Sequence, residues 1–194
     1  MIRTTSDLLD SFSGYANPDM KIKRMVQDGS LFRLRRGLYA TTQNISSYLL
    51  AGVIYGPSYI SFETALSRYG LIPERVYACT SATFRKNRSK TYKNDFGVFE
   101  YRDIPAAAYP LGVRLEQENG ISYAIASPEK AICDMLYTQS PVYSTKALED
   151  LLFDDLRIDE ENFGRLNYQD MQCLAPRYRR RNLRLLSELL EKRC

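Results

Sequence analysis

The chain has 194 residues, of which 44% are hydrophobic and 26% are charged, so it can bury a core and is not expected to be disordered. Its net charge is +4, so the location of the basic residues is more informative than their sum. No segment approaches the roughly 18 apolar residues of a membrane span, and the first residues lack the apolar core of a secretory signal, so a cytoplasmic protein with no membrane partner is expected.

Metal and cofactor chemistry has little support in the composition. The chain contains no histidine, which removes the commonest general base and a frequent metal ligand. The four cysteines are Cys79, Cys133, Cys173 and Cys194. They are far apart and form no CxxC pair, so they are expected to be buried thiols in a reducing compartment, with no metal site and no cofactor.

Two short helices are predicted at the start of the chain. A threonine at position 4 or 5 can cap the first, which ends near Phe12. Asn17 or Asp19 can cap the second, which ends at Gly29. At 100° per residue, this second helix has an apolar face and an opposite face of hydrogen-bond donors. The apolar face contains Ile22, Met25 and Val26. The opposite face contains Lys23, Arg24 and Gln27, with Lys21 at its edge.

An arginine-rich hairpin follows this helix, in the segment SLFRLRRGLYA. Apolar and basic residues alternate before Gly37, which permits a tight reversal. The cations are Arg33, Arg35 and Arg36. A basic helix followed by such a hairpin is typical of a recognition helix and wing, the DNA-contacting parts of a winged helix-turn-helix. The alternative is a solvated helix face beside a basic hairpin.

The remainder of the chain predicts a larger α+β domain with a mixed sheet and C-terminal helices. Helices are expected over residues 46–55, 62–69 and 127–137, and from 145 onward. Strands are expected over residues 76–84 and 97–104, and in a hairpin of 113–118 and 121–126. Polar residues 41–44 are the expected boundary, which gives a domain of residues 1–43 and a second of residues 44–194.

Two further basic segments lie in this second domain. The first is a predicted loop over residues 85–93, whose cations include Arg85, Lys86, Arg88 and Lys90. It can contact phosphate or an acidic protein, or be a solvated hairpin tip. The second comprises Arg177, Arg179, Arg180, Arg181 and Arg184. We expect these arginines to pair with the acidic tract of residues 149–161, with contact to protein or DNA as the alternative.

Enzyme chemistry is weakly indicated. The chain has no glycine-rich phosphate loop, and Asp154 and Asp155 are adjacent, so they would diverge on a helix. Ser61 and Lys130 could form a dyad, but nothing in the sequence connects them. We therefore predict a binding protein rather than an enzyme, with a carboxylate-dependent nuclease as the least favoured alternative.

Four ordered segments resemble the AbiEi-type antitoxins, the regulatory halves of type IV toxin–antitoxin operons linked to abortive phage infection. They are DGSLFRLRRGLYA (28–40), YISFETALSRYGLIPE (59–74), the strand pair around residues 76–104, and ASPEKAICDMLY (126–137). In the last segment, Glu129 and Lys130 are expected on the surface or facing a partner, beside a buried stripe of the same helix.

The resemblance implies a transcriptional regulator whose N-terminal winged helix binds inverted repeats in its own promoter. The sequence leaves the oligomeric state open, with a homodimer as one alternative. It also implies that the second domain neutralises a cognate nucleotidyltransferase toxin, directly or indirectly. By motif, it assigns DNA contact to the helix donors and the hairpin arginines, and identifies Gly37 as the glycine of the wing turn. The family has a further helix before these two, whereas only 19 residues precede Met20 here, so the winged helix is expected to be truncated. A protein-interaction module with a vestigial winged helix and no DNA binding is the alternative.

Overall fold

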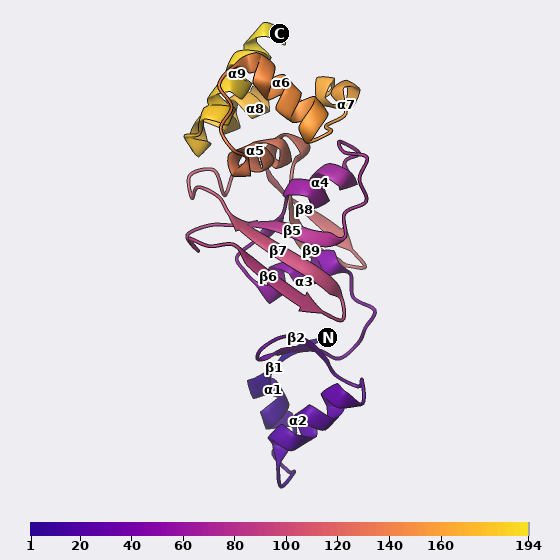
Figure 1. Ribbon diagram of the computed structural model, residues 1–194. Helices are drawn as coiled ribbons and strands as arrows, with labels where there is room; N and C mark the ends of the chain where they lie inside the picture. The colour runs from indigo at the N-terminus through magenta and orange to yellow at the C-terminus, as the bar shows by residue number, and fades with distance from the viewer. Residues whose placement is uncertain (194) are drawn as a thin grey trace.

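A six-stranded mixed sheet forms the middle of the computed structural model, which describes residues 1–193 (Figure 1). A small N-terminal unit (residues 1–40) lies at one end of this sheet and a helical cap (residues 128–193) lies at the other. We call residues 47–193, the sheet with its helices, the body. The predicted α+β class, with a mixed sheet and C-terminal helices, is confirmed.

The N-terminal unit combines two helices with a three-stranded antiparallel sheet. Its elements are β1 (Ile2–Thr4), α1 (Thr5–Ser11), α2 (Pro18–Gln27), β2 (Phe32–Arg35) and β3 (Leu38–Ala40). The strand order is β1-β3-β2, so β1 pairs with the last strand of the unit. Sequence reasoning missed β1, because a three-residue strand has no periodicity of its own and forms only through its pairing with β3.

Local capping explains why both helices begin where they do. Thr4 and Asp7 form a capping box, in which each side chain accepts a hydrogen bond from the other residue's backbone N–H. Asn17 Oδ1 accepts from Met20 N at 3.0 Å and starts α2. The predicted apolar face of α2 is confirmed, since Ile22 is buried with Leu8 from α1 in a small separate core.

The central sheet contains both parallel and antiparallel pairs. Its strands are β4 (Tyr59–Ile60), β5 (Ala78–Thr83), β6 (Lys90–Asn94), β7 (Gly97–Asp103), β8 (Val113–Glu118) and β9 (Ile121–Ala126). The strand order is β6-β7-β5-β4-β9-β8, with parallel pairing between β4 and β9 and between β5 and β7. The predicted β8–β9 hairpin is confirmed, and Asn119 and Gly120 both have positive φ, as its two-residue turn requires.

One predicted loop is shorter than expected. Residues 85–93 were predicted to be irregular, yet Lys90–Asn94 pairs antiparallel with β7 along its whole length. The strand is stable there because Tyr92 packs against Tyr55 and Tyr101, while Lys90 and Lys93 extend into solvent. The segment KTYKN has one aromatic residue among four lysine or uncharged polar residues, so the sequence alone did not predict a strand there.

Helices cover the sheet and build the cap. They are α3 (Ser47–Ile54), α4 (Phe62–Arg68), α5 (Pro128–Thr138), α6 (Thr145–Glu149), a π-helical turn η1 (Asp150–Asp155), α7 (Glu160–Gly164), α8 (Tyr168–Leu174), a 3₁₀ turn η2 (Ala175–Tyr178) and α9 (Arg181–Arg193). The sequence predicted the start of α5 correctly, because Ser127 Oγ accepts from Lys130 N at 3.2 Å and Pro128 occupies the first turn. Within residues 1–193, no helix has both the length and the apolar character needed to cross a membrane.

The N-terminal unit and the body share packing. Residues 41–46 contain no helix or strand, and the predicted boundary at residue 43 lies within this segment. Leu34 and Leu38 nevertheless join the main core of the body, and Phe32 packs edge-on against Phe96 with ring centroids 6.0 Å apart. Asn94 Nδ2 also donates to the carbonyl oxygen of Leu34 at 3.0 Å, so β2 lies beside β6. The hairpin is therefore anchored to the body.

Candidate nucleic-acid interface

The exposed face of α2 contains the donors that the sequence assigned to DNA contact. Lys23, Arg24 and Gln27 are all exposed, opposite the buried Ile22. Lys21 is half-buried, and its Nζ lies 5.5 Å from the centre of the Tyr15 ring. The three exposed side chains can therefore reach outward, whereas Lys21 is held at the start of the helix by a cation–π contact.

The three arginines of the hairpin occupy different positions, two on strand β2 and one in the turn. Arg36 is in the turn with Gly37, whose φ of +80° is the left-handed conformation that favours glycine. Arg33 and Arg35 are on β2, and the pairing register shifts between them, which marks a bulge. All three are exposed. The turn is tied to the start of α1, because Thr5 N donates to the carbonyl oxygen of Gly37 at 3.1 Å.

The basic loop before β6 has a defined conformation. Asp103 Oδ2 accepts from the backbone nitrogens of Lys86 and Asn87, both at 2.9 Å. Lys86 Nζ donates to the carbonyl oxygen of Gly56 at 3.2 Å, which fixes this side chain against the body. Arg85, Arg88 and Lys90 are exposed. Three of the four predicted cations of this surface are thus available to a partner, and Lys86 holds the loop in place.

The arginines near the start of α9 are not neutralised by the acidic tract, so that prediction is wrong. Within residues 1–193, the only carboxylate within ion-pair distance of this group is Glu188, whose Oε1 lies 3.8 Å from Arg184 Nε. The acidic tract pairs with other cations, and Arg193 at the far end of α9 binds both Glu149 (2.9 Å) and Glu160 (3.0 Å). Because α9 is 13 residues long, Arg181 at its start lies about 18 Å along the helix axis from Arg193, at 1.5 Å per residue.

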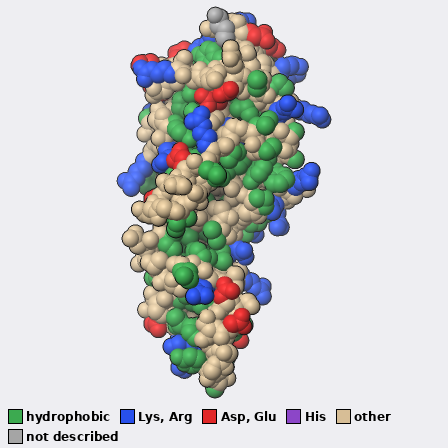
Figure 2. Space-filling view, turned by 180° about the vertical axis from the view of Figure 1, so that it is seen from behind, with side chains coloured by type: hydrophobic (Ala, Val, Ile, Leu, Met, Phe, Trp, Pro, Cys, Tyr) green, Lys and Arg blue, Asp and Glu red, His purple; other side chains and the backbone are tan. Residues whose placement is uncertain are grey.

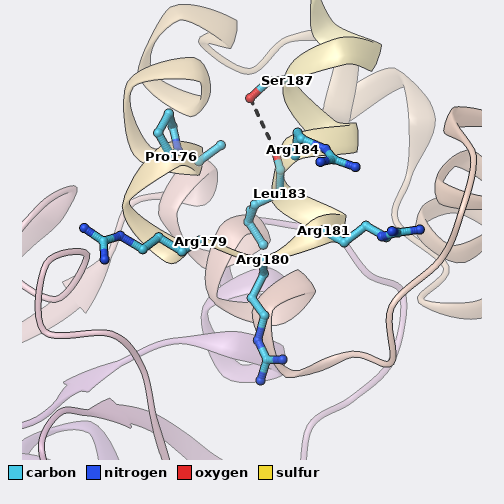
Figure 3. Close-up of a pocket in the computed structure, with 8 residues that line it drawn as sticks. Pro176, Arg179, Arg180, Arg181, Leu183, Arg184 and Ser187 are labelled. Atoms are coloured by element: carbon cyan, nitrogen blue, oxygen red, sulfur yellow. Dashed lines mark hydrogen bonds between the residues drawn. The ribbon is translucent and has the colours of Figure 1, made fainter.

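Aromatic rings support two of these arginines instead. The Arg180 guanidinium lies 5.0 Å from the centre of the Tyr137 ring, and that of Arg181 lies 4.5 Å from the Tyr143 ring. Arg179, Arg180 and Arg181 line a hollow of about 350 Å³. Figure 3 shows their side chains pointing in three different directions. Diverging cations cannot close around one small anion, so this arrangement suits an extended anionic surface.

The two basic segments of the body meet at one hollow of about 670 Å³. Arg88 from the loop and Arg180 from the cap both line it. Of the acids there, Glu63 binds Arg102 at 2.8 Å, and Asp103 is occupied by the loop nitrogens. Figure 2 shows Lys and Arg side chains projecting along one edge of the molecule, from the cap to the level of the sheet. The edge is therefore basic across elements far apart in sequence.

A buried polar cluster explains Ser61 and Lys130. Lys130 and Asp134 are fully buried on α5, with Lys130 Nζ 3.1 Å from Asp134 Oδ1. Ser61 Oγ donates to Asp134 Oδ2 at 2.7 Å, so the carboxylate separates serine from lysine. Tyr178 OH lies 2.5 Å from Lys130 Nζ and 2.6 Å from Asp134 Oδ1. Burial lowers the pKa of Lys130, while Asp134 acts to raise it. The cluster is a satisfied structural network with no exposed atom on its lysine or carboxylate.

This cluster corrects a prediction and reveals residues that the sequence did not single out. Glu129 and Lys130 were expected on the surface, but both are buried, because α5 packs against α4 as well as against α8 and α9. Asp134 lies four residues after Lys130, the spacing of an ion pair on one helix face. That spacing was the available signal, whereas Tyr178 has no signature in the sequence.

The remaining candidate residues are not drawn together. Asp154 and Asp155 are exposed on η1, and within residues 1–193 no three Cys, Asp or Glu side chains form a group that could hold a metal ion. Cys79 and Cys133 are buried as predicted, and burial raises the pKa of Cys79 to about 12. Cys173 is exposed, contrary to expectation, because it lies on the outer face of α8. Cys194 lies outside the described residues.

Comparison with models of known protein families gives no match, and no curated protein is significantly similar to the chain in sequence.

Proposed function

We propose that the protein is an antitoxin of a type IV toxin–antitoxin system that also represses its own operon by binding DNA. The observation that carries the proposal is the position of the exposed donors of α2 beside an arginine-rich hairpin. The order β1-α1-α2-β2-β3, with β1 paired to β3, supports assigning the N-terminal unit to the winged helix-turn-helix class. In this assignment α2 is the recognition helix and β2–β3 is the wing.

Anchoring compensates for the small size of the proposed winged helix. A unit of about 40 residues buries too little apolar surface to be stable by itself. Here β1 adds a third strand, and Leu34 and Leu38 pack into the main core of the body. The unit is thereby supported without a further helix, so the short sequence before α2 does not argue against DNA binding.

The body is the part proposed to neutralise a nucleotidyltransferase-type toxin in the cytoplasm, directly or indirectly. Its support is the basic edge, where Arg88, Arg179 and Arg180 are exposed and form no ion pair within residues 1–193. Exposed cations that are not paired internally are available to an acidic protein surface or to phosphate. The four segments that resemble the antitoxin family lie mostly in the body, which agrees with a role beyond DNA binding.

The DNA proposal predicts a specific salt dependence. Fluorescence anisotropy with a duplex from upstream of the operon would be measured from 50 to 300 mM salt. Replacing Arg35 and Arg36 with alanine should weaken binding and lower the slope of log affinity against log salt by up to about two, because two phosphate contacts are lost. Arg165→Ala is the matched control, since Arg165 is an exposed arginine in the helical cap. Equal affinity and slope for the double variant and the control would contradict the proposal.

A second candidate is a protein-interaction module that does not bind DNA. The observation in its favour is that Phe32, Leu34 and Leu38 of the hairpin pack onto the body, which gives the hairpin a structural role by itself. This candidate predicts a complex with the product of the neighbouring gene and no shift of upstream DNA. A DNA shift abolished by the Arg35 and Arg36 substitutions would exclude it.

A further inference from the structure

The two edges of the central sheet differ in how they are protected. At one edge, β6 carries the exposed Lys90 and Lys93, and the N-terminal unit lies against it through the bond between Asn94 and Leu34. At the other edge, β8 contains Leu115, which is 77% exposed. Lysines and covering segments are the usual protection of an edge strand. Only the β6 edge has both.

The β8 edge is regular and open. It pairs with β9 over six consecutive residues without a bulge, and it contains no proline or lysine. Within residues 1–193, no backbone hydrogen bond from another segment reaches the outer side of Leu115 or Gln117. An uncovered edge without a bulge and with an exposed leucine can pair with a strand of another chain.

The hairpin turn determines which backbone groups face outward. A two-residue turn joins Glu118 and Ile121, so these residues form a hydrogen-bonded pair. Because such pairs alternate along an antiparallel ladder, Glu116 and Arg114 also bond to β9. The N–H and C=O groups of Leu115 and Gln117 therefore point away from the sheet.

The charged residues of β8 favour one pairing register with a strand of another chain. We propose that β8 pairs antiparallel with β8 of a second copy of the chain, centred on Leu115, to give a two-fold dimer with a continuous sheet. In this register Leu115 meets Leu115 of the second copy, and Arg114 lies opposite Glu116 twice. A register centred on Glu116 would instead oppose two like charges. Opposite charges across the strands and an apolar centre both favour the leucine register.

The side chains needed for this pairing are available. Arg114 is exposed and forms no ion pair within residues 1–193. The hydrogen bonds that Glu116 receives from Arg68 and Tyr123 all end on Oε2, which leaves Oε1 for Arg114 of the second copy. The contact is isologous, so it closes at two copies and does not extend into a fibre. The inference depends on the edge strand alone and not on the proposed function.

Cysteine cross-linking tests the register directly. In a background with Cys173 and Cys194 changed to serine, Leu115→Cys should form an intermolecular disulfide under mild oxidation. Directly opposed residues of a hydrogen-bonded pair have Cα atoms about 5.5 Å apart, which a disulfide spans. Gln117→Cys is the matched control, because its two copies would be about 14 Å apart, at roughly 3.4 Å per residue over four residues. Equal cross-linking at both positions would overturn the proposed register.

Solution mass tests the dimer itself. Light scattering after gel filtration at 10 to 100 µM should give twice the chain mass for the unmodified protein. Leu115→Lys should give the monomer mass with an unchanged circular dichroism spectrum, whereas Tyr77→Lys, at an exposed residue outside β8, should stay dimeric. A monomer at every concentration, or a dimer that Leu115→Lys does not affect, would overturn the proposal. Neither measurement involves DNA, so its failure is separate from failure of the proposed function.

Discussion

The helical cap contains two groups of charged residues with opposite environments. Lys130 and Asp134 are fully buried and are satisfied by each other, by Tyr178 and by Ser61. The arginines around residue 180 are exposed, and most of them have no carboxylate partner within residues 1–193. The buried charges therefore maintain the fold, whereas the exposed ones are available to a partner. Substitutions in the two groups should separate stability from binding.

The largest effect is expected from breaking the buried pair. Asp134→Leu leaves Lys130 charged and buried, and also removes the acceptor of the Tyr59 and Ser61 hydroxyls. We expect the free energy of unfolding to fall by about 3–5 kcal/mol, measured by urea denaturation. Lys130→Met together with Asp134→Leu should cost less than the sum of the two single changes, because no unpaired charge remains. Additive losses would show that the two residues do not act as a pair.

Alkaline pH is expected to destabilise the folded protein through buried tyrosine and cysteine side chains of the sheet and the cap. Burial raises the pKa of Cys79, Tyr109 and Tyr123 to about 12 and also raises the pKa of Tyr59 and Tyr178, so the folded protein keeps protons that the unfolded chain releases near pH 9 to 10. The stabilisation is complete below pH 9 and is lost as the pH rises towards 12, because the unfolded chain then binds fewer protons than the folded protein.

Two measurements check this pH dependence. The free energy of unfolding would be determined under reducing conditions at pH 8, 9, 10 and 11, and it should decrease above pH 9. Lys130 acts in the opposite direction, because burial lowers its pKa and the unfolded lysine keeps its proton up to about pH 10.5. Cys79→Ala should flatten the decrease between pH 9 and 10. A stability that stays constant up to pH 11 would contradict the expected shifts.

The sequence predicted features that depend on neighbouring residues but did not predict which charged residues are buried and which are exposed. Helix starts such as Ser127-Pro128 and the Asn119-Gly120 turn depend on neighbouring residues, and both were predicted correctly. The positions of the charges depend on contacts across the fold. Lys130 is buried because Tyr178, 48 residues later, packs over it, and the arginines lack the acidic tract because Arg193 occupies it. Neither fact has a local signature.

In the candidate interface, too, the sequence predicted the local features and missed the contacts between distant segments. The helical period placed Lys23, Arg24 and Gln27 on the exposed face of α2 correctly. The sequence did not predict that the loop before β6 and the start of α9 line one hollow, since Arg88 and Arg180 are 92 residues apart. It also did not predict that β2 lies beside β6, because this contact depends on a single asparagine bond and on apolar side chains shared with the main core.

The smallest effect on stability is expected from the exposed arginines. Replacing Arg179 and Arg180 with glutamine should change the free energy of unfolding by less than about 0.5 kcal/mol, because both side chains are exposed and neither forms an ion pair within residues 1–193. Loss of the Arg180 contact with Tyr137 contributes little at an exposed site. The same variant should elute from immobilised heparin, a polyanion, at lower salt than the unmodified protein.

A lysine variant separates charge from shape at this surface. Arg179 and Arg180 changed to lysine keep the charge but lose the planar fork and the stacking on Tyr137. If the surface acts through charge alone, the lysine variant should elute like the unmodified protein, while the glutamine variant elutes earlier. If all three elute together, the arginines do not form an anion-binding surface, and the contrast with the buried pair would concern stability only.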